Sequence, residues 1–303
     1  MSAATLAVLG PGGVGGFLAA ALERAGEPVV VVAREPTASV IERDGLRVSS
    51  ERLGDFTANP RTVASLEEEV GVLFVAAKAP ALPAALDRIE REPGLVVPLL
   101  NGLDHLALLR DRFSAPVIAG SIRIEADRPE PGVIVQTSPF LRIDLASDDP
   151  SLGDRVGAIA ERLNAAEVPA QVLDSEAQVI WSKLVRLNAL ACTTSAADRP
   201  IGFIRTDPQW RRTLELAVAE GVAVGRAEGA RVDSETVMGE LNAAHETLGS
   251  SMQRDIAAGR TPELDAIPGA VLRAARRHGI AAPTIEQLTR QVASRAGEPM
   301  PGY

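Results

Sequence analysis

The sequence contains one cysteine and three histidines among 303 residues, and this scarcity excludes several kinds of chemistry. The single thiol, Cys192, cannot form an intrachain disulfide or a zinc site built from cysteines, and we expect it to be a small buried side chain. His105, His245 and His278 show no i, i+4 pairing, so no metal site is predicted. A G-x-S-x-G motif is also absent, which argues against a serine hydrolase of that type.

Positive charge and long apolar runs are scarce as well. The 31 Lys and Arg residues face 40 Asp and Glu residues, giving a net charge of -9 and a pI near 5.0. This balance argues against a broad nucleic-acid or anionic-membrane surface, although a local basic pocket remains compatible with it. No apolar run approaches the roughly 20 residues of a spanning helix, and the N-terminal MSAATLAVLG lacks a charged n-region. We predict a cytoplasmic protein with a small-molecule substrate and no nucleic-acid or membrane partner.

The pattern of apolar residues predicts a parallel sheet in the first part of the chain. Hydrophobic residues make up 46% and charged residues 23%, as in soluble globular proteins, and 303 residues favour two domains. Near-continuous Val, Leu, Ile and Ala indicate strands that are buried on both faces. The predicted strands are TLAVLG (5–10), PVVVVA (28–33), GVLFVAA (71–77), LVVPLL (95–100) and PVIAG (116–120).

Helical patterns lie between these strands, at 13–25, 79–90 and 154–166, and GVIVQTS with FLRIDLA (132–146) predicts an antiparallel pair. Beyond about residue 174 only amphipathic helices are expected, one of them starting at Asp207-Pro208, a capping acid followed by proline. We therefore predict an α/β domain over 1–172 and an all-helical domain over 173–303. The predicted helices of the second domain are 175–194, 208–228, 235–258, 269–278 and 284–296.

A glycine-rich loop lies directly between the first predicted strand and the first predicted helix. LAVLGPGGVGGFLAAAL carries a G-x-G-x-x-G spacing, in which the glycines permit a tight turn, close approach of a pyrophosphate and packing of helix on strand. The spacing also occurs in ordinary turns, but this context favours a dinucleotide and a Rossmann-type doubly wound domain. The predicted cofactor contacts are Gly10, Gly12, Gly13, Val14 and Gly15.

The end of the second strand bears on which dinucleotide binds. An acid there usually accepts from the ribose 2'-hydroxyl of NAD, whereas an arginine suits the 2'-phosphate of NADP. The first polar residue is Arg34, whose planar fork can bind a phosphate bidentately. Glu35 follows at once, but neighbours on an extended chain point in opposite directions, so we predict NADP(H). Lys78, just beyond the third strand, is either a second cation for the phosphate or a solvated loop lysine.

Three further segments contain candidate chemical groups. Asn101-Gly102 ends a strand at the ligand-facing edge of the sheet, where an amide can contact both a carbonyl oxygen and the nicotinamide, although Asn-Gly is also a plain turn. In VIWSKLVRLNALAC, Lys183 shares a stripe with apolar residues and would ordinarily be a lysine that covers apolar surface. SSMQRDIAAGRTPELD contains Ser251 and Glu263, which could equally be surface residues of helices.

Taken together, these segments resemble the ketopantoate reductase family. GPGGVGGFLAAAL, LLNGL, WSKL, SSMQRD and TPELDAIPGAVLRAARRHGIAAP follow the family's order over the whole chain. The resemblance implies that Lys183 is the catalytic lysine, Asn101 the active-site asparagine and Ser251 a substrate-binding serine. It also implies that Glu263 lies close to the lysine and the substrate hydroxyl. A lysine ammonium aimed at the ketone oxygen would supply both charge stabilisation and the proton.

The chain also departs from the family pattern. Positions four and eight beyond the lysine, usually asparagines that hold the substrate, are Leu187 and Ala191, and Leu248 stands where the family often has another asparagine. Asn188 is one residue late, about 100° around the helix, so it could replace a missing amide only in a distorted helix. We therefore expect a less polar substrate pocket that Leu187 and Asn188 help to form.

These observations predict an NADPH-dependent reductase of a 2-oxo acid, with ketopantoate (2-dehydropantoate) as the default substrate and pantoate as product. One alternative keeps the chemistry but acts on a less polar oxo or imino substrate in a specialised pathway. The other is a non-catalytic NADPH sensor, which the presence of Lys183, Asn101 and Glu263 disfavours. Apolar residues on the C-terminal helices permit a homodimer without requiring one.

Overall fold

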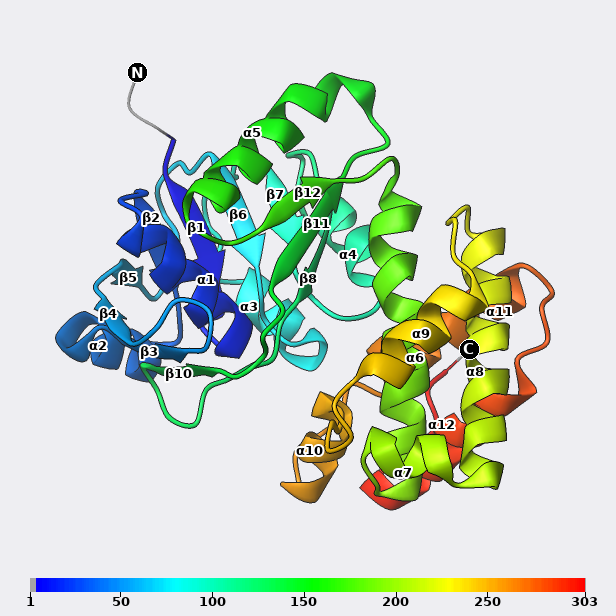
Figure 1. Ribbon diagram of the computed structural model, residues 1–303. Helices are drawn as coiled ribbons and strands as arrows, with labels where there is room; N and C mark the ends of the chain where they lie inside the picture. Colours follow the sequence, from blue (N-terminus) through cyan, green and yellow to red (C-terminus); the bar gives the residue numbers. More distant parts are fainter. Residues whose placement is uncertain (1–3, 303) are drawn as a thin grey trace. The chain divides into compact units, whose positions relative to one another are not determined.

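The computed structural model describes residues 4–302 (Figure 1). The chain forms two compact units, which are described separately below. The first comprises Met1–Leu100 and His105–Val179, and the second comprises Asn101–Asp104 and Ile180–Tyr303. The short segment 101–104 thus belongs to the second unit although its chain neighbours on both sides belong to the first. The domain boundary at residue 172 stays a prediction.

The first unit is built on a five-stranded sheet in which every pairing is parallel. Buried valine, leucine and phenylalanine side chains fill its central strands, as expected for a sheet covered on both faces. The order β5-β2-β1-β6-β7 places successive strands on opposite sides of β1, so a topological switch point lies at its carboxyl end. The strands are β1 (Leu6–Leu9), β2 (Val29–Val32), β5 (Arg61–Val63), β6 (Val72–Val75) and β7 (Val96–Pro98).

Helix α1 (Gly13–Arg24) lies between this sheet and a second one. It contacts β1 and β2 on one side and the sheet β4-β3-β10-β9 on the other, and Phe17, Leu18 and Leu22 are fully buried. The strands of the second sheet are β3 (Leu46–Ser50), β4 (Phe56–Ala58), β9 (Ala126–Asp127) and β10 (Val133–Gln136). The remaining helices of the unit are α2 (Glu35–Asp44), η1 (Ala79–Ala81), α3 (Leu82–Leu86), α4 (His105–Arg112), η2 (Pro150–Leu152) and α5 (Gly153–Ala165).

The predicted antiparallel pairing within 132–146 is wrong. β10 pairs with β3 and β9, whereas β11 (Arg142–Ala146) lies in a third sheet between β8 (Ala119–Arg123) and β12 (Ala170–Val172). Between the two strands, the buried hydroxyl of Ser138 accepts from the side-chain amide of Gln136 at 3.0 Å and donates to the Phe140 carbonyl at 2.7 Å. Similarly, the run 116–120 joins the parallel sheet only through one bridge between Val117 and Val96.

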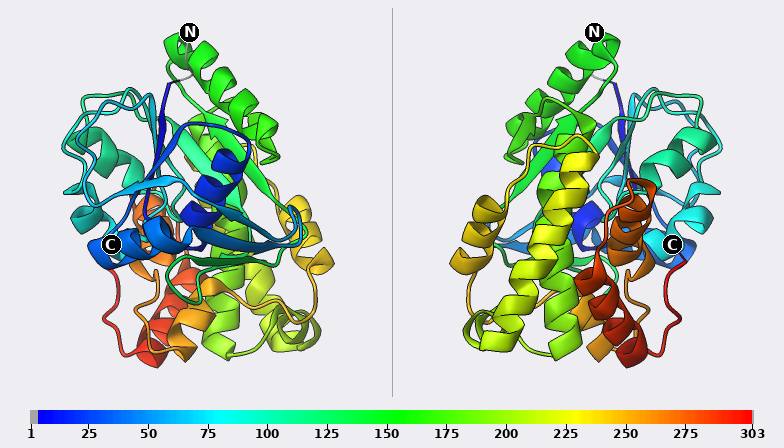
Figure 2. Two further views of the ribbon diagram at one scale, coloured as in Figure 1. Left: turned by 90° about the vertical axis from the view of Figure 1, so that its left-hand side faces the viewer. Right: turned by 90° about the vertical axis from the view of Figure 1, so that its right-hand side faces the viewer.

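The second unit is helical, and α8 (Pro208–Ala227) contacts most of its other helices. Asp207 caps α8 by accepting from the backbone amides of Gln209 and Trp210, both at 3.0 Å, as the sequence predicted. Gly221 and Gly225 let α8 approach α6 (Glu176–Ala197) closely, and Figure 2 shows these helices side by side. The others are α7 (Ile201–Thr206), α9 (Ser234–Ala243), α10 (Ser251–Ala257), the π-helical η3 (Asp265–Gly269), α11 (Ala270–Arg277) and α12 (Pro283–Ala296).

The single helix predicted over 235–258 is interrupted. α9 ends at Ala243 and α10 begins only at Ser251. The guanidinium of Arg205 donates to the carbonyls of Leu241 and Ala244, which satisfies acceptors that a continuing helix would have used. Among residues 4–302, no helix is both long and apolar enough to cross a membrane.

Candidate active site

In the first unit, the glycine-rich loop follows β1 at the switch point of the sheet. Gly10 has φ +89°, its amide donates to the Val32 carbonyl at 3.0 Å, and a Cβ there would lie 3.1 Å from the backbone of Ala77. A Cβ on Gly15 would lie 2.3 Å from the Gly10 carbonyl oxygen. The turn and the packing of α1 on this loop therefore require glycine at both positions.

The other loop residues differ in what their environment explains. A Cβ on Gly13 would lie 2.3 Å from the Ala126 carbonyl oxygen, and Val14 packs against the core of the unit. A Cβ on Gly12, in contrast, would meet no atom within 4 Å, so nothing in the described residues requires glycine there. Gly12 is the N-cap of α1, whose first turn contains no acid and receives no side-chain cap. This open, uncapped helix start fits a phosphate group.

Arg34 lies two residues beyond β2, where it is the N-cap of α2. Its side chain is exposed, and within residues 4–302 it forms no hydrogen bond or ion pair. Glu35 is the first residue of α2, where a carboxylate interacts favourably with the helix dipole. It also lines an open hollow of about 540 Å³ with Arg61 and Glu68, which form an ion pair with each other. The surroundings of Arg34 thus carry both signs of charge.

Lys78 is exposed at the N-cap of η1, three residues beyond the end of β6. Its backbone carbonyl accepts from the Ala81 amide at 2.9 Å. Like Arg34, it follows the carboxyl end of a strand in the parallel sheet, which is the edge where ligands bind in such folds.

In the second unit, three of the predicted residues form one chain of hydrogen bonds. Lys183, half-buried on α6, donates from Nζ to Oδ1 of Asn101 at 2.9 Å. Asn101 in turn donates from Nδ2 to Oε2 of Glu263 at 2.8 Å, and Glu263 is buried. These two bonds define which end of the amide faces the lysine, since only the oxygen can accept from an ammonium. Residues 82 and 162 positions apart are thereby brought together.

Local backbone features place Asn101 and Glu263. Gly102 has φ +96°, which turns the chain sharply just after Asn101. Glu263 precedes η3, where Pro268 has no amide to continue an α-helix and Gly269 donates instead to the Leu264 carbonyl, five residues back. A π-helical turn therefore follows directly after the buried carboxylate, and such turns occur frequently at functional sites.

The two adjacent serines have different environments. Ser250 is buried and caps α10, accepting from the Gln253 amide at 3.1 Å and from the Thr194 hydroxyl at 3.0 Å. Ser251 is half-buried at the first position of α10, and its hydroxyl has no hydrogen-bond partner within the part of the chain that the structure describes. Ser251 is thus the serine whose hydroxyl remains available to a ligand.

The segment beyond Lys183 is largely apolar. Leu187 is half-buried and Ala191 is buried. The side chain of Asn188 is also buried, its Oδ1 accepting from Sγ of Cys192 at 3.5 Å, and its Nδ2 has no acceptor among the described residues. Burial raises the pKa of the Cys192 thiol to about 12, so this group is not a thiolate nucleophile near neutral pH. Helix α6 is continuous through this region.

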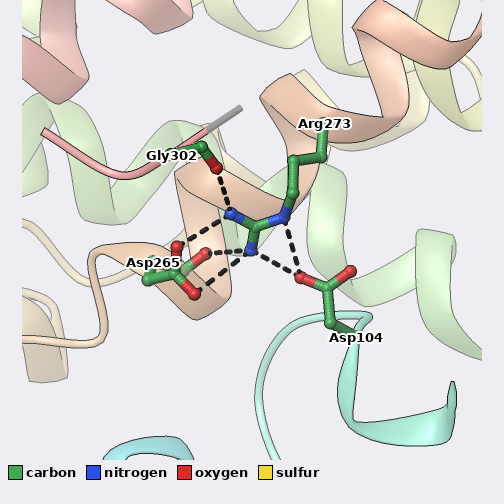
Figure 3. Close-up of polar contacts among 4 residues, drawn as sticks. All are labelled: Asp104, Asp265, Arg273 and Gly302. Atoms are coloured by element: carbon green, nitrogen blue, oxygen red, sulfur yellow. Dashed lines mark hydrogen bonds and ion pairs between the residues drawn. The ribbon is translucent and has the colours of Figure 1, made fainter. Parts of the chain in front are cut away.

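A further cluster was not foreseen from the sequence. Arg273 on α11 forms hydrogen bonds with Asp104 and Asp265, which lie three and two residues beyond Asn101 and Glu263 (Figure 3). The partners Asp104 and Arg273 are 169 positions apart, and no local sequence pattern indicates such a pairing. In residues 4–302 no group of three or more His, Cys, Asp and Glu side chains is arranged to hold a metal ion.

Known proteins are similar to this chain over both of its parts. The model of ketopantoate reductase PanE/ApbA matches residues 6–147, and that of its C-terminal part matches residues 177–296. A 2-dehydropantoate 2-reductase of Mycobacterium tuberculosis is 30% identical, over 97% of this chain and 98% of that protein. The structure of 2-dehydropantoate 2-reductase from Geobacter metallireducens GS-15 has a TM-score of 0.87 at 25% identity, over 96% and 99% of the two chains. The ternary structure of D-mandelate dehydrogenase with NADH and anilino(oxo)acetate has a TM-score of 0.87 at 20% identity, over 97% and 98%.

A parallel sheet with a glycine-rich loop at its switch point, followed by a helical unit that carries a lysine, an amide and a carboxylate, defines an oxidoreductase that uses a nicotinamide cofactor. Two family models that together match well over half of the residues narrow this class further. The chain belongs to the ketopantoate reductase family of NAD(P)-dependent enzymes that reduce 2-oxo acids.

Proposed function

We propose that the protein reduces a 2-oxo acid to a 2-hydroxy acid with NADPH, with 2-dehydropantoate as the default substrate and Lys183 as the general acid. The observation that carries the proposal is the hydrogen-bonded chain from Lys183 Nζ through Asn101 to the buried Glu263. It supports an ammonium held at one orientation, as a general acid needs.

Bound NADPH would supply the hydride for the ketone carbon. Negative charge then develops on the ketone oxygen, and Lys183 stabilises this charge and transfers a proton to the oxygen. Asn101 holds the ammonium through its amide oxygen, and Glu263 holds the amide. Ser251, with a hydroxyl that has no partner among the described residues, is assigned to the carboxylate or hydroxyl of the substrate.

The preference for NADPH rests on Arg34. Its exposed guanidinium has no ion-pair partner among residues 4–302 and can accept a 2'-phosphate, whereas Glu35 interacts favourably with its own helix N-terminus. Lys78 is assigned a supporting charge at the same edge of the sheet. Gly10, Gly12, Gly13, Val14 and Gly15 are assigned to the pyrophosphate, because the open position at Gly12 leaves room for it.

A second candidate keeps this chemistry and changes the substrate to a less polar oxo or imino compound. Leu187 and Ala191 are apolar, and the Asn188 amide lies buried beside Cys192, so the segment 187–191 of α6 offers few exposed hydrogen-bond donors. A substrate rich in hydroxyl groups would leave polar groups unpaired against this surface, at about 1–3 kcal/mol each. The D-mandelate dehydrogenase with the same fold was solved with anilino(oxo)acetate, an aromatic ligand.

The test is NADPH oxidation by the purified protein with a panel of 2-oxo acids, among them 2-dehydropantoate, a branched aliphatic acid and phenylglyoxylate. Turnover of at least one is expected. Tight NADPH binding without turnover of any panel member would contradict the proposal and favour a sensor. Leu187→Asn then separates the two candidates, since it should raise activity on 2-dehydropantoate relative to phenylglyoxylate only if Leu187 contacts the substrate.

A homodimer stays a prediction.

A further inference from the structure

Arg273 holds together three segments of the second unit (Figure 3). Its Nε and Nη2 donate to Oδ2 of Asp104 at 3.1 and 2.5 Å. Its Nη1 donates to Oδ1 of Asp265 at 2.8 Å and to the Gly302 carbonyl at 2.8 Å, and Nη2 also reaches the Asp265 carbonyl at 3.0 Å. One guanidinium therefore ties the loop 101–104 to the first turn of η3 and to the C-terminal tail.

A second contact joins the loop 101–104 to η3. A Cβ on Gly102 would lie 2.1 Å from the Ala266 carbonyl oxygen, so the two backbones pack directly against each other. The loop thus rests on η3 at Gly102 and is fastened to it by Asp104 through Arg273. Asn101 directly precedes Gly102, and Glu263 precedes η3. The two residues that share this hydrogen bond therefore both lie next to the region that Gly102 and Arg273 hold together.

We propose that Arg273 is a positioning residue that sets the geometry of Asn101 and Glu263, and through them the direction of the Lys183 ammonium. The inference rests on the proposed function of Lys183 as general acid. A loosened loop would let Asn101 shift relative to Glu263, and a displacement of about 1 Å can lower the rate of a reaction by about 100-fold.

The chemistry of the guanidinium suits this role. Burial alone would lower the pKa of Arg273, but its hydrogen bonds with Asp265 and Asp104 outweigh that effect and raise the pKa above its usual value. The group therefore stays charged at every pH at which the enzyme is folded. A lysine has three donors on one atom and cannot span two carboxylates and two carbonyls in one plane, so Arg273→Lys should restore the function only in part.

The first experiment compares kcat and KM of Arg273→Ala, Arg273→Lys and the control Arg277→Ala, with the 2-oxo acid that the wild-type enzyme reduces fastest. Arg277 lies one turn further along α11 and binds Glu228 instead, at 3.0 Å. We expect kcat to fall by about 100-fold in Arg273→Ala, with partial recovery in Arg273→Lys. KM for NADPH should be unchanged, and Arg277→Ala should keep kcat within about twofold. A lower melting temperature with normal kcat per folded enzyme would overturn the proposal.

A second measurement does not depend on turnover. Hydrogen exchange followed by mass spectrometry should become faster in peptides covering 101–104 and 263–266 of Arg273→Ala, but not of Arg277→Ala. Unchanged exchange would overturn the positioning role whether or not a substrate has been found, whereas an inactive wild-type enzyme with the expected exchange would count against the proposed function alone. In the double variant Asp104→Ala/Arg273→Ala, kcat should fall by less than the product of the two single losses, because both substitutions remove the same contact.

Discussion

Lys183 and Lys78 are the two lysines of the chain, and the structure places them in different compact units. Lys183 donates to Asn101, which is itself held by a buried carboxylate, whereas Lys78 is exposed next to the parallel sheet. The two side chains therefore offer a direct comparison between the proposed proton donor and a proposed cofactor contact.

Lys183→Ala should lower kcat by about 10² to 10⁴, the usual contribution of general acid catalysis, and leave the Kd of NADPH unchanged. Lys78→Ala should have the opposite effect, raising the Kd of NADPH while kcat at saturating cofactor stays close to that of the wild type. Stopped-flow turnover and fluorescence titration of NADPH measure the two quantities. If Lys183→Ala keeps its kcat, the lysine merely covers apolar surface.

The second prediction at the residue scale concerns the contribution of Arg34 to cofactor binding. Arg34→Ala should remove the proposed hydrogen bonds to the 2'-phosphate, and hydrogen bonds to a charged group are worth about 1.5–3 kcal/mol, so NADPH should bind about 10- to 100-fold more weakly. NADH, which has no 2'-phosphate, should bind to both proteins equally. Glu35→Ala serves as the adjacent control and should leave the affinities for both NADPH and NADH unchanged. A wild-type enzyme that already prefers NADH would show that Glu35, not Arg34, contacts the ribose.

At the scale of elements, the loop between β1 and α1 contains two kinds of glycine. Gly10 and Gly15 are needed for folding, whereas Gly12 has open space around it. Gly12→Ala adds a Cβ that meets nothing, so it should lower the free energy of unfolding by no more than about 1 kcal/mol, the difference between these residues at an N-cap. It should nevertheless weaken NADPH binding strongly, because the methyl group would occupy the space that we assign to the pyrophosphate.

Gly15→Ala is the matched variant, since its Cβ would lie 2.3 Å from the Gly10 carbonyl oxygen. It should destabilise the protein by at least about 1–3 kcal/mol, the usual penalty of overpacking. Urea unfolding and NADPH titration of both variants check this contrast. Equal stability losses in the two variants, or unchanged affinity in Gly12→Ala, would show that the open space is not a phosphate site.

The elements also show which features a single sequence can predict. Parallel strands such as Val29–Val32 were predicted correctly, because burial on both faces leaves a local pattern of β-branched residues. The partners of β10 and β11 were not, since alternation identifies a strand but not the strand that pairs with it. The break between α9 and α10 depends on a guanidinium from Arg205, about 40 residues away, and leaves no local signal.

At the scale of the whole molecule, the chain crosses into the second unit twice, first at Asn101–Asp104 and then at Ile180. The first crossing brings Asn101 to Lys183 and Glu263, which the family resemblance grouped together but no spacing in this sequence could. Asp104 and Arg273, which fasten that crossing, carry no recognisable motif, because an ion pair between distant residues depends on the fold.

The surface charge of the molecule determines how it responds to acid. The carboxyl groups whose pKa is shifted all have a lowered pKa. Asp198 accepts hydrogen bonds from Arg295 and Gln253, and Asp44, Glu69, Asp149 and Asp233 accept hydrogen bonds from Arg43, Arg91, Ser151 and Thr236, respectively. A carboxyl whose pKa is lower in the folded than in the unfolded state stabilises the fold above the unfolded value, about 3.9 for Asp. That contribution is lost as the pH falls through the folded value.

Asp198→Asn tests this argument, because it removes one such carboxyl, which binds Arg295 at 2.9 Å. The variant should melt at a lower temperature than the wild type at pH 7, and the difference should begin to shrink as the pH falls below about 4 and vanish only below the folded pKa, where the wild-type carboxyl is protonated as well. Asp87→Asn is the control, since Asp87 is exposed and its side chain has no partner among residues 4–302. Melting temperatures from pH 7 to pH 3 at constant ionic strength provide the comparison. A difference that is as large at pH 3 as at pH 7 would mean that Asp198 contributes through its shape or packing and not through its charge.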